Sequence, residues 1–473
     1  MQPSVPNLAR AAVADRFADH LDIKELLVAD WDDAFWPAAD SAPSRADRRG
    51  GPYSTYRPDL LVERPLTLAA DVSELAGRVE ASVRRLGELP GSRGLEGLAR
   101  FLLRSEAIAS SRIEGLQVSP QQVGLAEVAE EESLTAENVN HTAKKVAANI
   151  SALRRATHEL ADAERLSVAG VEGLQTLLLA DEPHLHGVRD VQNWIGGSDY
   201  HPLSAEFVPP APPLVPALVD DLVVYMNGGD HAPLVQAGLV HAQFETIHPF
   251  RDGNGRVGRA LIHTVLVRRG LTRHAVLPIS PVLLTRSQEY VQGLTDYRYS
   301  GPATSVQGQQ GVSQWLRVFL QAVGIAVTQA EQFAVSLEEL RQHWEQEVAA
   351  KRREQNLRET PRADSATSRI LATLQEHPVL TTVSVMRLFD VSRPAAVTAL
   401  DELASAGVLA KRRLDRRTGG YLAMDVFALI TTAERQLAST RWDTGTAKPA
   451  RPTPYPADGV GPAPGDGSTD MRG

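Results

Sequence analysis

The sequence predicts a mainly α-helical protein that carries one short β-hairpin and a small separate unit towards its C-terminus. Apolar residues recur at helical spacing through most of residues 71–345. This pattern breaks at 187–208, where apolar residues flank a Gly-Gly pair and prolines close the segment, which indicates a β-hairpin. Beyond a charged stretch, residues 368–425 have the pattern of three short helices followed by another hairpin.

The chain before residue 71 differs from the helical region after it. Residues 1–60 mix short helical pieces with a Pro-, Gly- and Arg-rich stretch, which we expect to be loop. Gly115 ends the second long helical pattern, as glycine often does. The expected helices cover residues 71–89, 95–115, 136–162, 171–180, 214–227, 233–247 and 256–270, with another pair over about 287–345.

Changes in composition divide the chain into six regions. Residues 346–367 are charged and have few apolar anchors, so we expect a linker or an exposed helix end there. The Pro- and Gly-rich end of the chain indicates disorder. The expected regions are an N-terminal extension at 1–60, a helical region at 61–125, a central core at 126–345, the linker, a C-terminal unit at 368–430 and a disordered tail at 431–473.

The composition limits the class of protein. A chain of 473 residues is long enough for several units with their own cores. Its net charge of −9 argues against a general nucleic-acid coat but allows a local basic patch. Without cysteine it has no disulfide, thiolate zinc site or cysteine nucleophile. We find neither a signal peptide nor a membrane-length apolar run, and therefore expect a cytoplasmic protein with no membrane partner.

Residues 248–259 read HPFRDGNGRVGR, and their chemistry suits an anion. Arg256 and Arg259 fall in the first turn of an expected helix, where the helix dipole disfavours cations. Gly253 and Gly255 allow positive φ and a nest of amide groups, and the helix N-terminus itself attracts anions. Two guanidinium groups, a nest and a helix end at one place predict a di- or triphosphate site.

Asp252 and His248 add a metal and a base to this prediction. Asp252 would repel phosphate unless a divalent cation such as Mg²⁺ bridges the two. His248 titrates near neutral pH and can accept a proton from a hydroxyl group. Together these residues predict phosphoryl or nucleotidyl transfer, and the residues alone do not decide between attack at the α- and the γ-phosphorus.

The same stretch resembles the signature H-x-F-x-(D/E)-G-N-G-R-x-x-R of the Fic family, and every specified position matches. The similarity extends over about residues 95–345. The resemblance implies a Fic-type helical bundle in which residues 187–208 form a β-hairpin flap that aligns a target segment by strand addition. A plain structural hairpin is the alternative. The resemblance also implies transfer of AMP from ATP to a Tyr, Thr or Ser hydroxyl of a target protein, with release of pyrophosphate.

The resemblance further implies a role for each motif residue. His248 would be the base, Asp252 the Mg²⁺ ligand and Arg259 the contact to the γ-phosphate. The residues expected to bind the α- and β-phosphates are Gly253, Asn254, Gly255 and Arg256. Gly255 favours AMP transfer, because the related Doc kinases carry lysine at that position. Two residues that suit either the nucleotide pocket or the buried core are Gln243 and Tyr290.

A second motif lies upstream, in SSRIEG at 110–115. Taken alone, Glu114 is a solvated charge at a helix end, where the helix dipole disfavours it. The stretch resembles the family's inhibitory motif (S/T)-x-x-x-E-(G/N) through Ser110, Glu114 and Gly115. The resemblance implies that Glu114 pairs with Arg259 and keeps the γ-phosphate out, so we expect autoinhibition.

The unit at 368–430 resembles a winged helix-turn-helix. Ser392 suits an N-cap and Pro394 suits the first helical turn. A basic cluster would form the wing, and it consists of Lys411, Arg412, Arg413, Arg416 and Arg417. The unit would contact a DNA backbone or would serve in protein interaction or dimerisation, and the sequence favours neither.

We therefore predict an autoinhibited protein adenylyltransferase that uses ATP and Mg²⁺ and forms a homodimer. One alternative is a DNA-binding regulator whose Fic-like part senses nucleotide. Another is a Fic-fold enzyme with a different transfer or a de-AMPylation activity. The intact His248 and Asp252 favour the first prediction, since a pure sensor needs no base.

Overall fold

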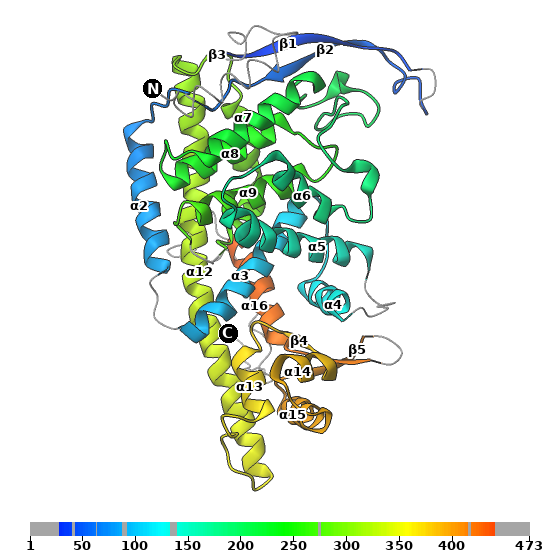
Figure 1. The fold of residues 1–473 in the computed structure, drawn as a ribbon, viewed down its shortest axis with the longest axis vertical. Coiled ribbons are helices and arrows are strands. Elements are labelled where there is room, and N and C mark those ends of the chain that lie inside the picture. The colour runs from blue at the N-terminus through cyan, green and yellow to red at the C-terminus, as the bar shows by residue number, and fades with distance from the viewer. Residues whose placement is uncertain are drawn as a thin grey trace, which may run out of the picture.

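One long helix, α12 (Val306–Glu354), runs along the molecule and contacts both its large helical part and its small C-terminal unit (Figure 1). The computed structural model describes residues 28–39, 43–62, 64–87, 92–132, 140–272, 276–414 and 418–439. In length and composition α12 could span a membrane, but half of its most apolar window is buried inside the protein. Its apolar face is therefore used to join the large part of the molecule to the small C-terminal unit.

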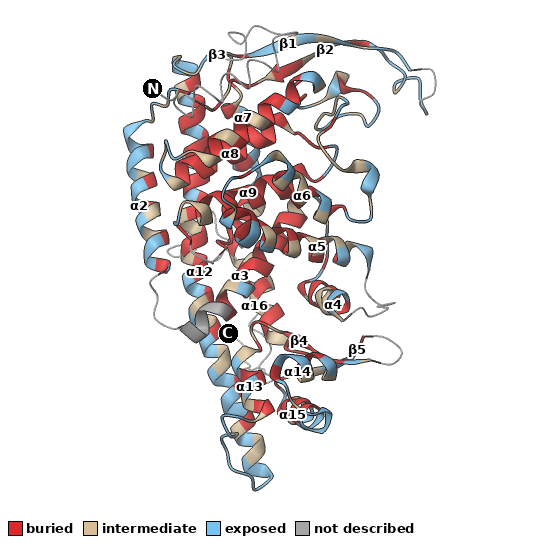
Figure 2. Cartoon of the chain, in the orientation of Figure 1, coloured by how far each residue is buried: buried red, intermediate tan, exposed pale blue. Residues whose placement is uncertain are grey.

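The large part is built around two antiparallel buried helices, α8 (Pro233–Ile247) and α9 (Asn254–Arg268). Nearly all of their residues are buried, whereas α2 (Ala70–Leu86) is exposed along one side (Figure 2). The helices around them are α3 (Ser92–Ile113), α4 (Pro120–Glu131), α5 (His141–Arg155), α6 (Val168–Leu178), α7 (Val215–Asn227), α10 (Ile279–Thr285) and α11 (Ser287–Tyr297). Short helical turns lie at Ala156–Leu160, Pro183–Leu185, Pro202–Ser204 and Pro212–Leu214.

Side-chain caps explain where several of these helices begin. Ser119, Asn140 and Ser167 accept hydrogen bonds from amide groups in the first turns of α4, α5 and α6. Ser305 does the same for α12. The mainly helical prediction for the region after residue 71 is confirmed. The prediction was possible because caps and apolar spacing are both local signals.

The prediction of helical pieces and loop before residue 60 is wrong at Val28–Trp36 and Gly51–Arg57, which are strands, whereas residues 37–39 and 43–50 are loop and turn as expected. Strands β1 (Val28–Trp36) and β2 (Gly51–Arg57) form an antiparallel hairpin, and β3 (Gly301–Pro302) pairs with the start of β1. Aromatic contacts hold this hairpin to the rest of the protein. Trp31 lies edge-on to Phe207, and Trp36 lies edge-on to Trp194. Such distant contacts leave no signal in the local sequence.

The hairpin predicted at 187–208 is reduced to a single antiparallel bridge between Ile195 and Phe207. Gly196 and Gly197 adopt positive φ between them, as a tight turn requires. Prolines at 202, 209 and 210 lack the amide hydrogen that a longer ladder needs. The segment is thus a loop with one antiparallel bridge and the short helical turn Pro202–Ser204.

The C-terminal unit contains four helices and a three-stranded antiparallel sheet with strand order β4-β6-β5. Its elements are α13 (Ala366–Thr373), β4 (Val379–Leu380), α14 (Thr382–Phe389), α15 (Arg393–Ser405), β5 (Ala410–Arg413), β6 (Gly419–Leu422) and the closing helix α16 (Met424–Ser439). Two expected boundaries differ from the structure. Helix α12 continues into the expected linker as far as Glu354, and α16 continues into the expected tail as far as Ser439. Arg416, Arg417 and residues 440–473 lie outside the described residues.

Candidate active site

The motif loop begins with a left-handed residue and ends at the start of α9. His248 follows α8 with φ 50°, and Gly253 precedes α9 with φ 86°. Between them Phe250 is fully buried. The side chain of Asn254 accepts a hydrogen bond from the Phe250 amide and donates one to its carbonyl, each 2.8 Å long. Asn254 therefore closes the loop on itself, whereas the family resemblance implied a phosphate contact.

Two residues from the segment after α6 donate hydrogen bonds to the backbone carbonyl of His248. Arg189 donates from Nε to the His248 carbonyl at 2.9 Å, and Asn193 donates to the same carbonyl at 3.2 Å. The Arg189 guanidinium also donates to the carbonyls of Val191 and Pro210 and is almost fully buried. The unusual backbone of His248 is thereby fixed. The sequence offered no signal for this role, since a single arginine between Val188 and Asp190 has many possible functions.

The His248 ring is enclosed, with Nδ1 buried and without a hydrogen-bond partner. Burial and the nearby charge of Arg189 lower the pKa of His248 to about 4. Glu114 acts in the opposite direction but does not offset them. The imidazole is therefore neutral at physiological pH, which is the form that accepts a proton.

A titration tests this protonation state. Because the folded-state pKa is lowered, His248 should stay neutral down to about pH 4, whereas an unperturbed histidine would be about nine-tenths protonated at pH 5.5. The measurement is an NMR titration of ¹⁵N-histidine-labelled protein, with His248→Gln to assign the signal. In Glu114→Gln the midpoint should not rise, since the Glu114 carboxylate favours the protonated form. A midpoint near 6.5 would contradict the prediction.

Arg256 is the clearest sign that an anion belongs here. Arg256 is only 4% exposed, and its Nε and Nη1 atoms are buried without hydrogen-bond partners. Nη2 lies 3.8 Å from Asp252 Oδ1, which is an ion pair but too long for a hydrogen bond. Buried donors without acceptors are unfavourable. A phosphate at the N-terminus of α9 would satisfy them, since the first amide groups of a helix also lack intrahelical acceptors.

Arg259 in contrast has its donors occupied by the end of α3. Nε donates to Ser110 Oγ at 2.9 Å, and Nη2 donates to the Ser110 carbonyl at 2.8 Å and to Glu114 Oε1 at 2.7 Å. Burial alone would lower the pKa of Arg259, but the Glu114 carboxylate outweighs it and raises the pKa. Burial opposes the ionisation of Glu114, but the positive charge of Arg259 favours it more strongly, so the pKa of Glu114 is lowered. Both groups are therefore charged at neutral pH.

Gly255 has a different physical role from the one that the sequence indicated. Gly253 has the expected positive φ, but Gly255 lies inside α9 with no positive φ. A Cβ atom at position 255 would overlap Glu114 Oε1 and approach Arg259 Nη1 to 2.9 Å. Glycine at 255 is thus required for space beside the Glu114–Arg259 pair and not for backbone conformation.

Gln243 belongs to the core in this structure, not to a nucleotide pocket. It is fully buried, donates to the Asp59 carbonyl at 2.8 Å and accepts from the Tyr297 hydroxyl at 2.9 Å. Tyr290 is nearly buried, stacks on His241 and shares a 2.9 Å hydrogen bond with that ring. Its predicted contact with nucleotide stays a prediction.

Glu245 is a buried carboxyl group in the site that the sequence analysis missed. One of its oxygens, Oε2, lies 3.9 Å from His248 Nδ1, and the other is buried without a partner. Burial raises the pKa of Glu245 to about 7, although Arg259 favours its ionised form. Its position one turn before His248 on α8 was visible in the sequence, but its burial was not.

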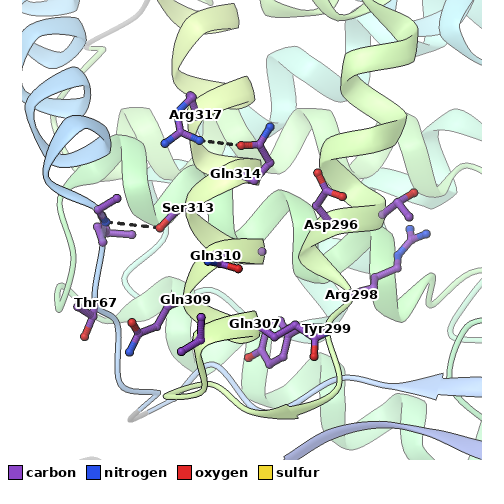
Figure 3. A pocket seen from close by; sticks show the side chains of 15 residues that line it. Thr67, Asp296, Arg298, Tyr299, Gln307, Gln309, Gln310, Ser313, Gln314 and Arg317 are labelled. Atoms are coloured by element: carbon purple, nitrogen blue, oxygen red, sulfur yellow. Dashed lines mark hydrogen bonds between the residues drawn. The ribbon is translucent and has the colours of Figure 1, made fainter.

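A large polar cavity lies elsewhere, at the N-terminal end of α12. It has a volume of about 790 Å³ and is lined by Gln307, Gln310 and Gln314 of α12 together with Arg298 and Thr67 (Figure 3). No residue of the 248–259 motif or of the 110–115 stretch lines it. We assign the cavity no part in the candidate site.

Comparisons with known proteins find similarity to one family. Residues 165–266 match the Fic/DOC family, and residues 80–158 match the Fic/DOC family N-terminal region. The chain is 34% identical over 178 residues to a probable protein adenylyltransferase of Aquifex aeolicus. The aligned stretch covers 37% of this chain and 52% of that protein. It is 29% identical over 114 residues to the protein adenylyltransferase fic-1 of Caenorhabditis briggsae, which covers 24% of this chain and 20% of the relative.

The chain therefore spans about half the length of the Aquifex relative and a fifth of the nematode one. Among solved structures, a Fic family protein from Desulfovibrio desulfuricans G20 is 20% identical, with a TM-score of 0.45 over 76% of this chain and 98% of that one. The two matched stretches contain both motifs discussed above, 110–115 and 248–259. Residues 80–158 and 165–266 of this chain are thus similar to the Fic/DOC family.

Proposed function

We propose that the chain is a protein adenylyltransferase, which transfers AMP from ATP to a Tyr, Thr or Ser hydroxyl of a target protein. His248 takes the proton of that hydroxyl. The hydroxyl oxygen then forms a bond to the α-phosphorus of ATP, and the bond from this phosphorus to the oxygen that bridges to the β-phosphorus breaks. Pyrophosphate leaves with the electron pair of the broken bond.

One observation carries the proposal, namely that a neutral, partly buried histidine and an unsatisfied buried arginine flank the same helix N-terminus. His248 supplies the acceptor for a proton, and Arg256 has two donors without acceptors. A base alone would suit many reactions, and an arginine alone would suit any anion. Side by side they suit attack of a hydroxyl on a bound phosphate group.

The residues of the candidate site are also suited to binding Mg²⁺. Within the part of the chain that the structure describes, no group of three or more His, Asp or Glu side chains could hold a metal ion. The side chain of Asp252 is about half exposed at the mouth of the loop. One carboxylate with phosphate oxygens and water is a common Mg²⁺ environment, so Asp252 would hold the ion. When bound, Mg²⁺ would neutralise part of the phosphate charge.

We further propose that Glu114 inhibits this reaction from within the chain. Support comes from the 2.7 Å contact between Glu114 Oε1 and Arg259 Nη2 and from the approach of Glu114 to Gly255. A phosphate group that needs Arg259 meets a carboxylate that already holds it. Like charges at that distance repel, so ATP cannot bind productively until Glu114 moves.

The position of a radioactive label in ATP tests the reaction type. The Glu114→Gly variant is incubated with cell lysate and with ATP labelled at either the α- or the γ-phosphorus, and the label that the lysate incorporates without the variant is subtracted. We expect protein-bound label from the α-labelled ATP alone, because the γ-phosphate leaves with pyrophosphate. Label retained from γ-labelled ATP would replace the proposal with a kinase reaction. Absence of label from either would overturn the proposal of a transferase.

We also propose that the C-terminal unit is a winged helix-turn-helix that binds DNA. Its order of helices and strands supports this fold, with β5 and β6 as the wing. The side chains of Lys411, Arg412 and Arg413 on β5 are exposed, which suits contact with phosphate. Duplex-DNA affinity that falls with salt and with the Arg412→Glu substitution would support the proposal. Lack of binding would favour a protein-interaction module.

A further inference from the structure

Glu114 lies at the tip of a tight turn that ends α3. Gly115 adopts φ 78°, its amide donates to the Arg112 carbonyl at 2.9 Å, and the Leu116 amide donates to the Ser111 carbonyl at 3.0 Å. Hydrogen bonds of this kind close a helix C-terminus compactly. The direction in which Glu114 points therefore depends on what holds this turn.

Arg112, two residues before Glu114, ties the turn to the far end of the chain. Its Nη1 forms an ion pair with Glu434 Oε2 on α16, and its Nη2 donates to the Val118 carbonyl at 3.0 Å. The two side chains are 16% and 14% exposed. Their remaining polar atoms, Arg112 Nε and Glu434 Oε1, are buried without hydrogen-bond partners. Removal of either partner leaves a largely buried charge unpaired, which is strongly destabilising for that contact.

Other contacts place the C-terminal unit against the helix that follows the turn. Phe427 of α16 packs so closely on Gly124 of α4 that a Cβ there would be 2.8 Å from the ring. The Thr381 hydroxyl donates to Glu132 at 2.6 Å. Figure 1 shows α16 beside α3 and close to α4. Both helices that flank the Glu114 turn are thus docked on the same unit.

We propose that the C-terminal unit holds Glu114 on Arg259 through the Arg112–Glu434 ion pair, which makes Arg112 a positioning residue for autoinhibition. The proposal rests on the proposed function, since it assumes that Glu114 inhibits. When α16 is docked, Arg112 and Val118 hold the turn in the geometry that lets Glu114 reach Arg259. When α16 is displaced, Arg112 loses its partner and the turn loosens. A ligand that pulls α16 away from α3 therefore activates the enzyme.

The test is the Glu434→Gln variant, which keeps the size of the side chain and removes its charge. Self-labelling with α-labelled ATP should rise about fivefold or more over wild type, the range in which such couplings act. The charge-reversed pair Arg112→Glu with Glu434→Arg should return towards wild-type activity, which a purely structural defect would not do. Adding Glu434→Gln to Glu114→Gly should give no further increase, because both act on the same contact.

A matched control removes an ion pair elsewhere in the same interface. Glu131→Gln breaks the exposed pair between Glu131 of α4 and Arg387 of α14, and it should leave the activity unchanged. Thermal unfolding checks that each variant is folded. Wild-type activity in Glu434→Gln, or a further increase on top of Glu114→Gly, would overturn the proposal.

Hydrogen exchange gives a readout that needs no activity. Amides of residues 110–118 should exchange faster in Glu434→Gln than in wild type or Glu131→Gln, because the turn has lost its support. If exchange is faster in Glu434→Gln but no variant, Glu114→Gly included, shows any labelling, the proposed transferase activity is refuted. The positioning role of Arg112 is then still supported. Unchanged exchange in Glu434→Gln would refute the positioning role whatever the activity of Glu114→Gly.

Discussion

Replacing His248 by alanine in the Glu114→Gly background should lower the rate of AMP transfer by about a hundredfold or more. In the proposed reaction the neutral imidazole takes the hydroxyl proton, and its low pKa keeps it available. Initial rates of label transfer from α-labelled ATP measure the effect. ATP affinity, measured by calorimetry, should change little, since the phosphate contacts lie with the arginines.

His184→Ala serves as the matched control for this prediction. His184 is an exposed histidine in the short helical turn after α6, and its loss should leave the rate unaltered. If the His248→Ala variant retained a substantial fraction of the rate, another group would have to be the base. Glu245 would be the first to examine, because its carboxyl lies within 4 Å of the His248 ring.

Glu114→Gly should raise self-labelling above wild type by roughly 5- to 150-fold, the span of typical coupling free energies. The substitution frees Arg259 from its carboxylate partner, and Arg259 can then hold a phosphate. The measurement is the initial rate of labelling at fixed ATP, followed by its dependence on ATP concentration.

Glu114→Gln sharpens the interpretation of that increase. Glutamine keeps the size of the side chain but not its charge, so it should also activate if electrostatic exclusion of phosphate is the cause. Activation by glycine alone would point to steric blocking beside Gly255 instead. Equal rates in wild type and Glu114→Gly would remove the case for inhibition by this residue.

Much of the helical fold was predictable from local signals. Apolar spacing defines α2 and α3 without reference to the rest of the chain, and Gly115 marks the end of α3. The β1–β2 hairpin was not predictable, because the contacts that hold it come from Phe207 and Trp194, far along the chain. The end of α16 was missed for a similar reason, since its contacts come from α4, α10 and α12.

The sequence by itself determined the chemical groups of the candidate site, because twelve consecutive residues contain a base, an acid and two arginines in a loop that leads into a helix. Only the tertiary structure decided how those groups are used. Burial makes His248 a neutral base, leaves Arg256 with unsatisfied donors and turns Asn254 and Gln243 to structural roles. Packing of α3 on α9 brings Glu114 to Arg259, and packing of α16 on α3 brings Glu434 to Arg112. Burial and long-range packing depend on segments that are distant in the chain, so no local pattern can encode them.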